Sequence, residues 1–261
     1  MRLALFQLDA FTRRRFGGNP AAVMPLDAFL PDGVMQAVAA ENNLSETAFL
    51  VPQGADYRLR WFTPAVEVPL CGHATLASAA VVMERLEPGR AAVTFHTVSG
   101  PLPVRRSGAG YVMDFPVRRT TPIAAPAALI DALGARPREV LADSASYLAV
   151  LEDEEAVRSL TPDLAAVGRL DRSGVIVTAR GSGQYDMVSR YFTPARGIPE
   201  DPVTGSAHCA TAAYWSERIG KPALRAYQAS RRGGEMLCRV RGERVELEGE
   251  CVFYLEGNAE I

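Results

Sequence analysis

The feature that most constrains the fold of this chain is a segment that it contains twice. Residues 60–86 and residues 190–219 both carry the string Arg-x-Phe-Thr-Pro-Ala, and both continue through a glycine into a long run rich in Ala and other helix-forming residues. Two half-chains built on one plan are the simplest explanation of such an internal repeat. The sequence therefore predicts two similar domains.

The two copies also match around the start of the Ala-rich run. In an alignment without gaps, Cys71 falls opposite Asp201. Three inserted residues, 202–204, then restore the match. The pairs beyond this insertion are Gly72 with Gly205 and His73 with Ser206.

A helix is predicted to begin at each of the two paired glycines. The first turn of a helix has backbone N–H groups without intrahelical partners and carries the positive end of the helix dipole, so it attracts anions. If the two copies face each other, a carboxylate or an enolate fits between the two helix ends. The alternative is that both segments are only closely packed core helices. That alternative explains the alanines, but not the His, Asp and Ser at the helix ends.

The composition excludes several classes of partner. The chain has 261 residues, 48% of them hydrophobic and 22% charged, and its formal net charge is −2. Without a basic excess, neither nucleic acid nor an anionic membrane surface is an expected partner. No apolar run approaches the ~18 residues that a membrane-spanning helix needs, and residues 1–10 alternate like a strand rather than a signal peptide. The expected location is the cytoplasm.

Cysteine usage argues against a metal site. The four cysteines show no Cys-x-x-Cys spacing and no pairing with histidine at metal-ligand intervals, so neither a zinc site nor a disulfide framework is expected. No glycine-rich nucleotide-binding motif is present either. We therefore predict a protein that uses no metal and no cofactor. The cysteines are Cys71, Cys209, Cys238 and Cys251.

A proline-rich segment, 116–126, is the natural linker between the two halves. We place the domain boundary after residue 117, which gives domains of residues 1–117 and 118–261. This boundary lies close to where the repeat offset of about 130 residues would put it. In this prediction, the last strand can pack with the first domain.

One carboxylate has an unusual position. Residues 44–52 are predicted to form a strand, and because side chains alternate along a strand, Glu46 shares a face with Ala48 and Leu50. Desolvation on an apolar face disfavours the ionised form of a carboxylate and suits it to act as a general base or acid. The alternative is that Glu46 lies at the frayed start of the strand and points into water. Spacing alone leaves both open.

Six motifs are spread in order along the whole chain. They are Gly18-Asn19-Pro20-Ala21, Asn43-Leu44-Ser45-Glu46-Thr47-Ala48, Arg60-x-Phe62-Thr63-Pro64, Cys71-Gly72-His73-Ala74-Thr75, Asp201-Pro202-Val203-Thr204-Gly205-Ser206-Ala207-His208 and Gln228-Ala229-Ser230-Arg231-Arg232-Gly233. Any one of them is weak, but together they are highly specific. In this set the chain resembles the PhzF-like family, isomerases related to phenazine biosynthesis.

This resemblance implies the diaminopimelate-epimerase-like fold. In that fold, two similar α+β domains each wrap a strongly curved, mostly antiparallel sheet around a central helix, and the active site lies in the cleft between the domains. The two repeated segments would supply the central helices, in agreement with the repeat. The resemblance also implies a homodimer and a small anionic substrate.

The resemblance further implies a cofactor-free reaction in which Glu46 carries a proton between carbons of an unsaturated ring acid. His73 and Asp201 would position a polar group of the substrate or relay a proton, and Ser206 would donate a hydrogen bond to it. The N–H groups at the two helix starts would stabilise negative charge on the substrate. The other expected substrate-binding residues are Asn19, Ser45, Gly72, Ala74, Gly205 and Ala207.

Two other functions stay open at this point. One is a two-thiol racemase or epimerase on the same fold, which needs one cysteine at each helix tip. Cys71 occupies one such position, but Asp201 stands opposite it, and Cys209 lies about a turn into its helix. The other is a binding protein that has kept the cleft and lost catalysis, although a pure scaffold has no need for ionisable groups in a dry cleft. The fold does not identify the substrate.

Overall fold

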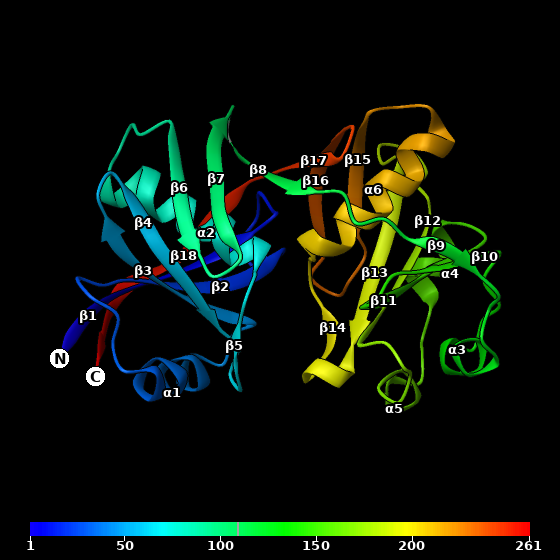
Figure 1. Ribbon diagram of the computed structural model, residues 1–261, viewed down its shortest axis with the longest axis horizontal. Coiled ribbons are helices and arrows are strands. Elements are labelled where there is room, and N and C mark those ends of the chain that lie inside the picture. The colour runs from blue at the N-terminus through cyan, green and yellow to red at the C-terminus, as the bar shows by residue number, and fades with distance from the viewer. Residues whose placement is uncertain (109) are drawn as a thin grey trace. The chain divides into compact units, whose positions relative to one another are not determined.

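The computed structural model describes residues 1–108 and 110–261. Contacts group the chain into two compact units, each a mixture of strands and helices (Figure 1). Unit 1 comprises Met1–Asp114 and Glu248–Ile261, and unit 2 comprises Phe115–Leu247. The junction therefore lies at Asp114 rather than after residue 117, and the C-terminal segment from Glu248 packs with unit 1.

The described residues of unit 1 form mainly strands, with two α-helices. The helices are α1 (Asp32–Asn42) and α2 (Gly72–Val81), and a short π-helical segment η1 (Val82–Leu86) continues α2. The strands are β1 (Arg2–Ala10), β2 (Asn19–Pro25), β3 (Glu46–Gln53), β4 (Asp56–Phe62), β5 (Glu67–Val68), β6 (Ala92–Thr97), β7 (Gly100–Ser107), β8 (Gly110–Pro116) and β18 (Cys251–Glu260).

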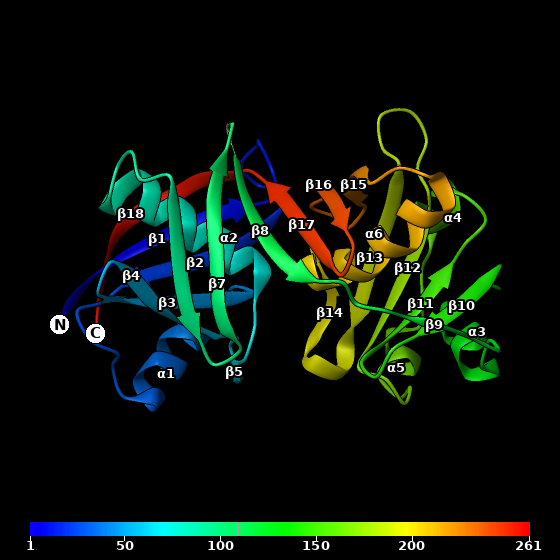
Figure 2. The same ribbon diagram turned by 45° about the horizontal axis from the view of Figure 1, so that its top comes forward.

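The sheet of unit 1 is mostly antiparallel. Its strands pair in the order β18-β1-β2-β3-β4-β6-β7-β8, and the pairs β2–β3 and β4–β6 are parallel while the others in this order are antiparallel. The strands surround α2 (Figures 1 and 2), and every residue of α2 after Gly72 is buried. Its Ala and Ser side chains are small, so the sheet packs closely around it. A second core, which includes Met35, Phe49 and Phe62, lies between the sheet and α1.

Unit 2 is likewise a mixture of strands and helices. Its helices are α3 (Ala127–Leu133), α4 (Glu154–Ser159), α5 (Leu164–Val167), η2 (Pro194–Arg196) and α6 (Gly205–Ile219). Its strands are β9 (Thr121–Ile123), β10 (Glu139–Ala142), β11 (Ser146–Val150), β12 (Gly174–Arg180), β13 (Met187–Thr193), β14 (Ile198–Asp201), β15 (Ala223–Gln228), β16 (Gly234–Arg241) and β17 (Arg244–Gly249). The predicted linker is not an irregular segment, because β9 lies within it and pairs with β10.

The strand pairing confirms that both halves follow one plan. In unit 1, β2 is parallel to β3, β3 is antiparallel to β4, β4 is parallel to β6, and β6 is antiparallel to β7. In unit 2 the same alternation runs through β11, β12, β13, β15 and β16. The helix α6 contacts β12, β15 and β16 as the central element of unit 2 (Figure 2). The predicted α+β fold with two central helices is therefore present.

The register of the strands corrects the sequence alignment of the two copies. In β4, Trp61 pairs with Val68, and the corresponding residue of β13, Tyr191, pairs with Asp201. Asp201 therefore matches Val68, and the residue that matches Cys71 is Thr204. The three extra residues lie between Phe192 and Glu200, the pair that corresponds to Phe62 and Glu67, instead of at 202–204. The alignment without gaps had matched Pro69 with Pro199, and this match gave the wrong register.

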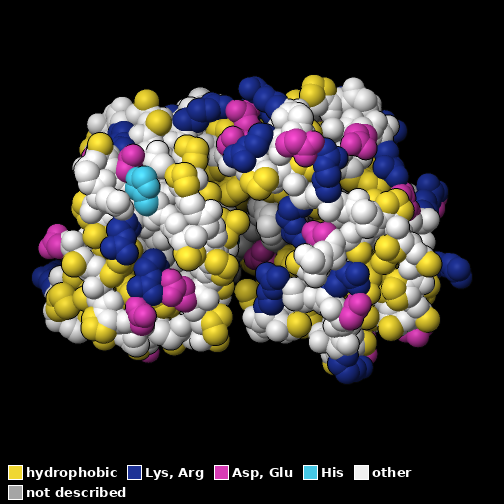
Figure 3. Space-filling view, in the orientation of Figure 1, with side chains coloured by type: hydrophobic (Ala, Val, Ile, Leu, Met, Phe, Trp, Pro, Cys, Tyr) yellow, Lys and Arg dark blue, Asp and Glu magenta, His cyan; other side chains and the backbone are white. Residues whose placement is uncertain are grey.

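Surface charge is mixed on the face in Figure 3, where basic and acidic side chains alternate without a continuous patch of one sign. This agrees with the small net charge of −2. Among the described helices, none combines the length and the apolar composition that crossing a membrane requires.

Candidate functional site

Two strand starts position the polar residues of unit 1. Because β2 and β3 run parallel and Ala21 pairs with Glu46, the residues just before these pairs lie side by side. Gly18 sets the entry into β2. Its φ of +61° is one that L side chains rarely adopt, and a Cβ there would lie 2.1 Å from the Ala10 carbonyl oxygen. Only glycine therefore lets the chain place Asn19 at this point.

The helix α2 brings His73 to the same place. The imidazole Nε2 lies 3.1 Å from Glu46 Oε2, and Nδ1 lies 3.2 Å from the Asn19 amide nitrogen. On the far side of Asn19, the Ser45 hydroxyl donates to Oδ1 over 3.0 Å. The expected site residues Glu46, His73, Asn19 and Ser45 thus form one connected cluster, with Gly72 and Ala74 next to it in the first turn of α2.

The contact between Glu46 and His73 is buried. The side chain of Glu46 is 12% exposed and that of His73 is 5% exposed, so Glu46 does not point into water. Although Glu46 Oε2 and His73 Nε2 are close, neither atom forms a hydrogen bond with a described residue. Buried polar atoms are almost always hydrogen-bonded in folded proteins, and exceptions mark places where a ligand or a function is expected.

Burial and neighbouring groups shift the protonation of two side chains in this cluster. Burial alone would lower the pKa of His73, but the adjacent Cys71 and Glu46 outweigh it and raise the pKa well above its ordinary value. Burial raises the pKa of the Cys71 thiol to about 11, although His73 acts in the opposite direction. Cys71 therefore keeps its proton at neutral pH.

The side chains of Glu46, Cys71 and His73 have potential metal-binding atoms within 4.8 Å of one another. Different imidazole nitrogens face the two partners, however. Nε2 faces the Glu46 carboxylate, and Nδ1 faces the Cys71 sulfur at 3.5 Å. All ligands of a metal ion point at that ion, and a histidine binds it through one ring nitrogen. The arrangement therefore supports a hydrogen-bonded cluster better than a metal centre.

In unit 2, a turn before α6 holds the corresponding residues. Thr204 precedes the first helical residue, Gly205, and its hydroxyl donates to the Asp201 carboxylate. Gln228, which is fully buried on β15, fixes the turn from both ends. Its amide oxygen accepts from Thr204 N at 2.8 Å, and its amide nitrogen donates to the Asp201 carbonyl oxygen at 2.7 Å.

The first turn of α6 differs in polarity from that of α2. Ser206, which matches His73, is exposed, and Gly205 and Ala207 beside it are buried. The nearby His208 is buried, its Nδ1 lies 2.7 Å from the Thr204 carbonyl oxygen, and burial lowers its pKa to about 4. His208 is therefore a neutral side chain that supports the turn. No role for Thr204 or Gln228 was predicted from the sequence, although both residues occur in the quoted motifs.

Comparison with known proteins agrees with this arrangement. The profile of the family described as phenazine biosynthesis-like protein matches residues 8–257. A Pseudomonas aeruginosa protein named as an uncharacterized isomerase is 51% identical over 261 residues, which cover 100% of both chains. The chain belongs to the PhzF-like family. The names of such relatives support an isomerase class for it.

Solved structures of the PhzF-like family have the same fold. A crystal structure of a PhzF-family phenazine biosynthesis protein from Enterococcus faecalis is 44% identical with a TM-score of 0.97, and the match covers 100% of each chain. A predicted epimerase from Pseudomonas aeruginosa is 25% identical with a TM-score of 0.76, over 98% of this chain and 99% of the other. These likenesses confirm the epimerase-like α+β fold.

The two-thiol alternative gains no support from the PhzF-like architecture of this chain. A two-thiol enzyme needs a cysteine before each central helix, and Thr204 occupies that position in α6. Cys209 lies within α6 and is buried. Since the Cys71 thiol also stays protonated, it is a poor base.

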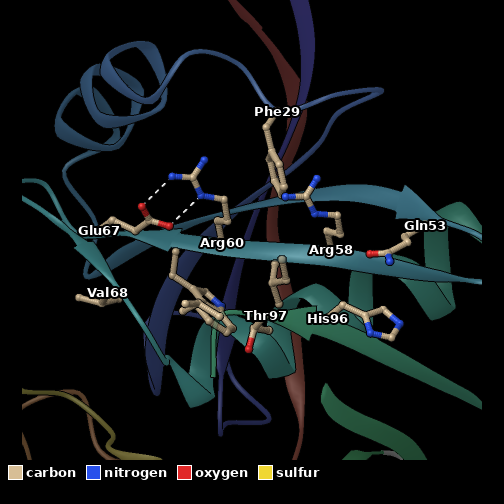
Figure 4. Close-up of a pocket in the computed structure, with 11 residues that line it drawn as sticks. Phe29, Gln53, Arg58, Arg60, Glu67, Val68, His96 and Thr97 are labelled. Carbon is tan, nitrogen blue, oxygen red and sulfur yellow. Dashed lines mark hydrogen bonds and ion pairs between the residues drawn. The ribbon is translucent and has the colours of Figure 1, made fainter. Parts of the chain in front are cut away.

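A cavity of about 450 Å³ opens elsewhere in unit 1, where β4 separates from β6 (Figure 4). None of the expected site residues lines it. Arg60 projects towards it, but two carboxylates, Glu67 and Asp32, bind its guanidinium. Arg58 lies over the Phe29 ring, 4.8 Å from its centre. We therefore base the functional argument on the cluster around Glu46.

Proposed function

We propose that this protein is an isomerase that moves a proton between two carbons of a small carboxylate-bearing substrate, with Glu46 as general base and then general acid. The observation that carries the proposal is the buried pair of Glu46 Oε2 and His73 Nε2, which are 3.1 Å apart and have no other hydrogen-bond partner among the described residues. Two such atoms are available to a substrate group that binds beside them.

The proposed step conserves protons and electrons. The Glu46 carboxylate removes a proton from an acidic C–H bond, and the electron pair of that bond becomes an enolate. The protonated carboxyl group then delivers the proton to a different carbon, and the carboxylate is restored. A group that both takes and gives a proton works best in surroundings where its two forms are close in free energy. Because no electrons leave the substrate, the step requires no redox cofactor.

Helix starts are proposed to stabilise the negative charge that develops on the substrate. In α2, the N–H groups of Gly72, His73 and Ala74 belong to the first turn, which has no intrahelical acceptors for them. In α6, Gly205, Ser206 and Ala207 have the same position. Preorganised N–H donors are an effective way to stabilise an enolate. The proposed roles of Asp201 and Ser206 are to hold a polar group of the substrate.

A deuterium-exchange screen tests this function. The protein is incubated in D2O with a library of small unsaturated acids, and NMR or mass spectrometry detects deuterium on substrate carbons or a shifted double bond. The variant Glu46→Gln should lose about 10²- to 10⁴-fold in rate, the usual contribution of a general base. Its circular dichroism and its affinity for the ligand should stay near those of the natural protein.

The exposed carboxylate Glu41 on α1 offers a matched control, since Glu41→Gln makes the same chemical change away from the cluster. Equal turnover in the Glu46→Gln and Glu41→Gln variants would refute the assigned base. A ligand that binds tightly but acquires no deuterium and no rearranged bond would instead favour the non-catalytic binding protein.

A further inference from the structure

In unit 2, the first turn of α6 is held by an arginine from the segment just before β9. Arg118 Nη1 donates to the Ser206 carbonyl oxygen over 3.2 Å, and Arg118 Nη2 donates to the Asp143 carboxylate. The backbone N–H of Arg118 also donates to the Cys209 carbonyl oxygen over 3.3 Å. Arg118 therefore contacts α6 at two points, once with its backbone and once with its guanidinium.

The Asp143 carboxylate that binds Arg118 has a fixed position. Its Oδ1 accepts from the N–H groups of Ala145 and Ser146 over 2.8 and 2.7 Å, so it closes the turn between β10 and β11. Burial alone would raise the pKa of this carboxyl group, but the N–H groups and the charge of Arg118 outweigh burial and lower the pKa below its ordinary value. Arg118 therefore binds a partner that is ionised at neutral pH and held by the backbone.

The corresponding helix start in unit 1 is held in a different way. The residue that matches Ser206 is His73, and its own imidazole lies beside Glu46 and Asn19. Ser206 has a short and exposed side chain, and its contact with Arg118 is made through its backbone carbonyl group. This contact does not use the Ser206 hydroxyl or the N–H groups of the first turn, which the proposed function assigns to the substrate.

We propose that Arg118 is a positioning residue that fixes the first turn of α6 against the turn at Asp143, so that the first N–H groups of the helix keep one direction. This inference deepens the proposed function, on which its catalytic meaning rests. Helix ends fray, and the residue before α6, Thr204, makes no side-chain capping hydrogen bond. Donors stabilise a developing charge best when they are fixed before the reaction. The planar guanidinium of arginine suits this role, because it binds two acceptors in a fixed geometry.

Amide hydrogen exchange followed by NMR tests the inference without a substrate. The first N–H groups of a helix have no intrahelical acceptor, so the informative hydrogens are those of residues 208–210, which bond to the carbonyl groups of residues 204–206. The His208 N–H, for example, donates to the Thr204 carbonyl oxygen over 3.3 Å. In Arg118→Met we expect these hydrogens to exchange at least about tenfold faster, because the variant loses hydrogen bonds made by a charged group. Tyr214 and Trp215, further along α6, should keep their exchange rates.

The next residue, Arg119, offers a matched control. Its side chain is 62% exposed and binds Glu243 at the surface, so Arg119→Met also removes an ion pair but should leave exchange at residues 208–210 unchanged. Arg118→Lys keeps a charge but lacks the planar guanidinium, so we expect the same faster exchange, and it gives the test where Arg118→Met does not fold. Natural exchange rates at residues 208–210 in the folded variant, or an equal rise at Tyr214 and Trp215, would overturn the proposal.

Kinetics with a substrate found in the deuterium screen test the catalytic meaning. Because the helix start acts on charge that develops in the transition state, Arg118→Met should lower kcat by about tenfold or more with KM nearly unchanged. An unchanged kcat would refute the positioning role. The inference and the proposed function can fail separately. Loss of isomerisation in Glu46→Gln with natural exchange in Arg118→Met would leave the function and refute the role of Arg118. Faster exchange in Arg118→Met of a protein that moves no substrate hydrogen would do the reverse.

Discussion

The two units share one arrangement of strands, but the first residue of one strand differs between them. In unit 1 the strand β3 begins with Glu46, and in unit 2 the corresponding strand β12 begins with Gly174. The strand register establishes this match. The corresponding pairs are Thr47 with Phe62 and Val175 with Phe192.

Unit 2 has no room for a side chain at the position of the acid. A Cβ on Gly174 would lie 2.3 Å from the Tyr191 hydroxyl oxygen and 2.6 Å from carbons of its ring. Tyr191 is buried, and its hydroxyl lies 3.4 Å from the Ser146 hydroxyl. The two units have therefore diverged at this position. Unit 1 has the side chain of Glu46 there, whereas in unit 2 the side chain of Tyr191 fills the space. This difference fits a reaction in which a single group both removes and returns the proton.

The largest expected effect comes from putting a side chain into that space. Gly174→Ala should destabilise the protein by about 3 kcal/mol, because the new methyl group overlaps a buried aromatic ring that has to shift. Urea unfolding measures the change. Gly33 on α1 provides the control, since a Cβ there meets nothing within 4 Å and Gly33→Ala should be neutral or slightly stabilising. If Gly174→Ala has the same free energy of unfolding as the natural protein, Tyr191 does not fill this space, and the contrast between Gly174 and Glu46 is wrong.

A smaller effect is expected from the turn before α6, which the buried amide of Gln228 holds in unit 2. Gln228→Leu removes the partners of Thr204 N–H and of the Asp201 carbonyl group, and unpaired buried groups cost roughly 2–3 kcal/mol in total. In unit 1, Gln36 donates to the Thr63 carbonyl oxygen in a half-buried position. Gln36→Leu should therefore cost less, about 1 kcal/mol. Equal losses of unfolding free energy in the two variants would contradict this asymmetry.

The smallest effect concerns pH and the buried histidine of unit 2. His208 has a folded pKa of about 4, below the ordinary value of 6.5, so the unfolded chain binds a proton that the folded chain does not. Stability from this group is complete above pH 6.5 and is lost as the pH falls towards 4. Between pH 7 and pH 5 the loss should be on the order of 2 kcal/mol.

Urea unfolding of the natural protein and of His208→Gln at the two pH values isolates this contribution. The variant should lose less stability on acidification, because it has no side chain to protonate at that position. Parallel pH profiles of the two proteins would show that His208 is not held in its neutral form.

The sequence predicted local features of the site better than the contacts between them. The starts of both central helices were predictable, because a glycine before an Ala-rich run is a local signal repeated in the two copies. The alternation of side chains along β3 placed Glu46 on an apolar face, although spacing alone left open whether the side chain was buried or pointed into water. Both depend on residues that are close together in the chain.

The contact of His73 with Glu46 and Asn19 was not predictable in the same way. It depends on the parallel pairing of β2 with β3 and on how α2 packs against both strands, and spacing along the chain determines neither. The match of Cys71 with Thr204 was missed for a related reason. Strand register placed the extra residues between Phe192 and Glu200, whereas the alignment had followed a shared proline.

The C-terminal strand has a consequence for how the protein is made. β18 pairs with β1 along its length, from Arg2 with Glu260 to Ala10 with Cys251, so the two ends of the chain complete one sheet. Unit 2 is continuous, and its residues have all left the ribosome before β18 does. The half that contains Glu46 can therefore close its sheet only after all of unit 2 has been synthesised, and until then β1 lacks this partner.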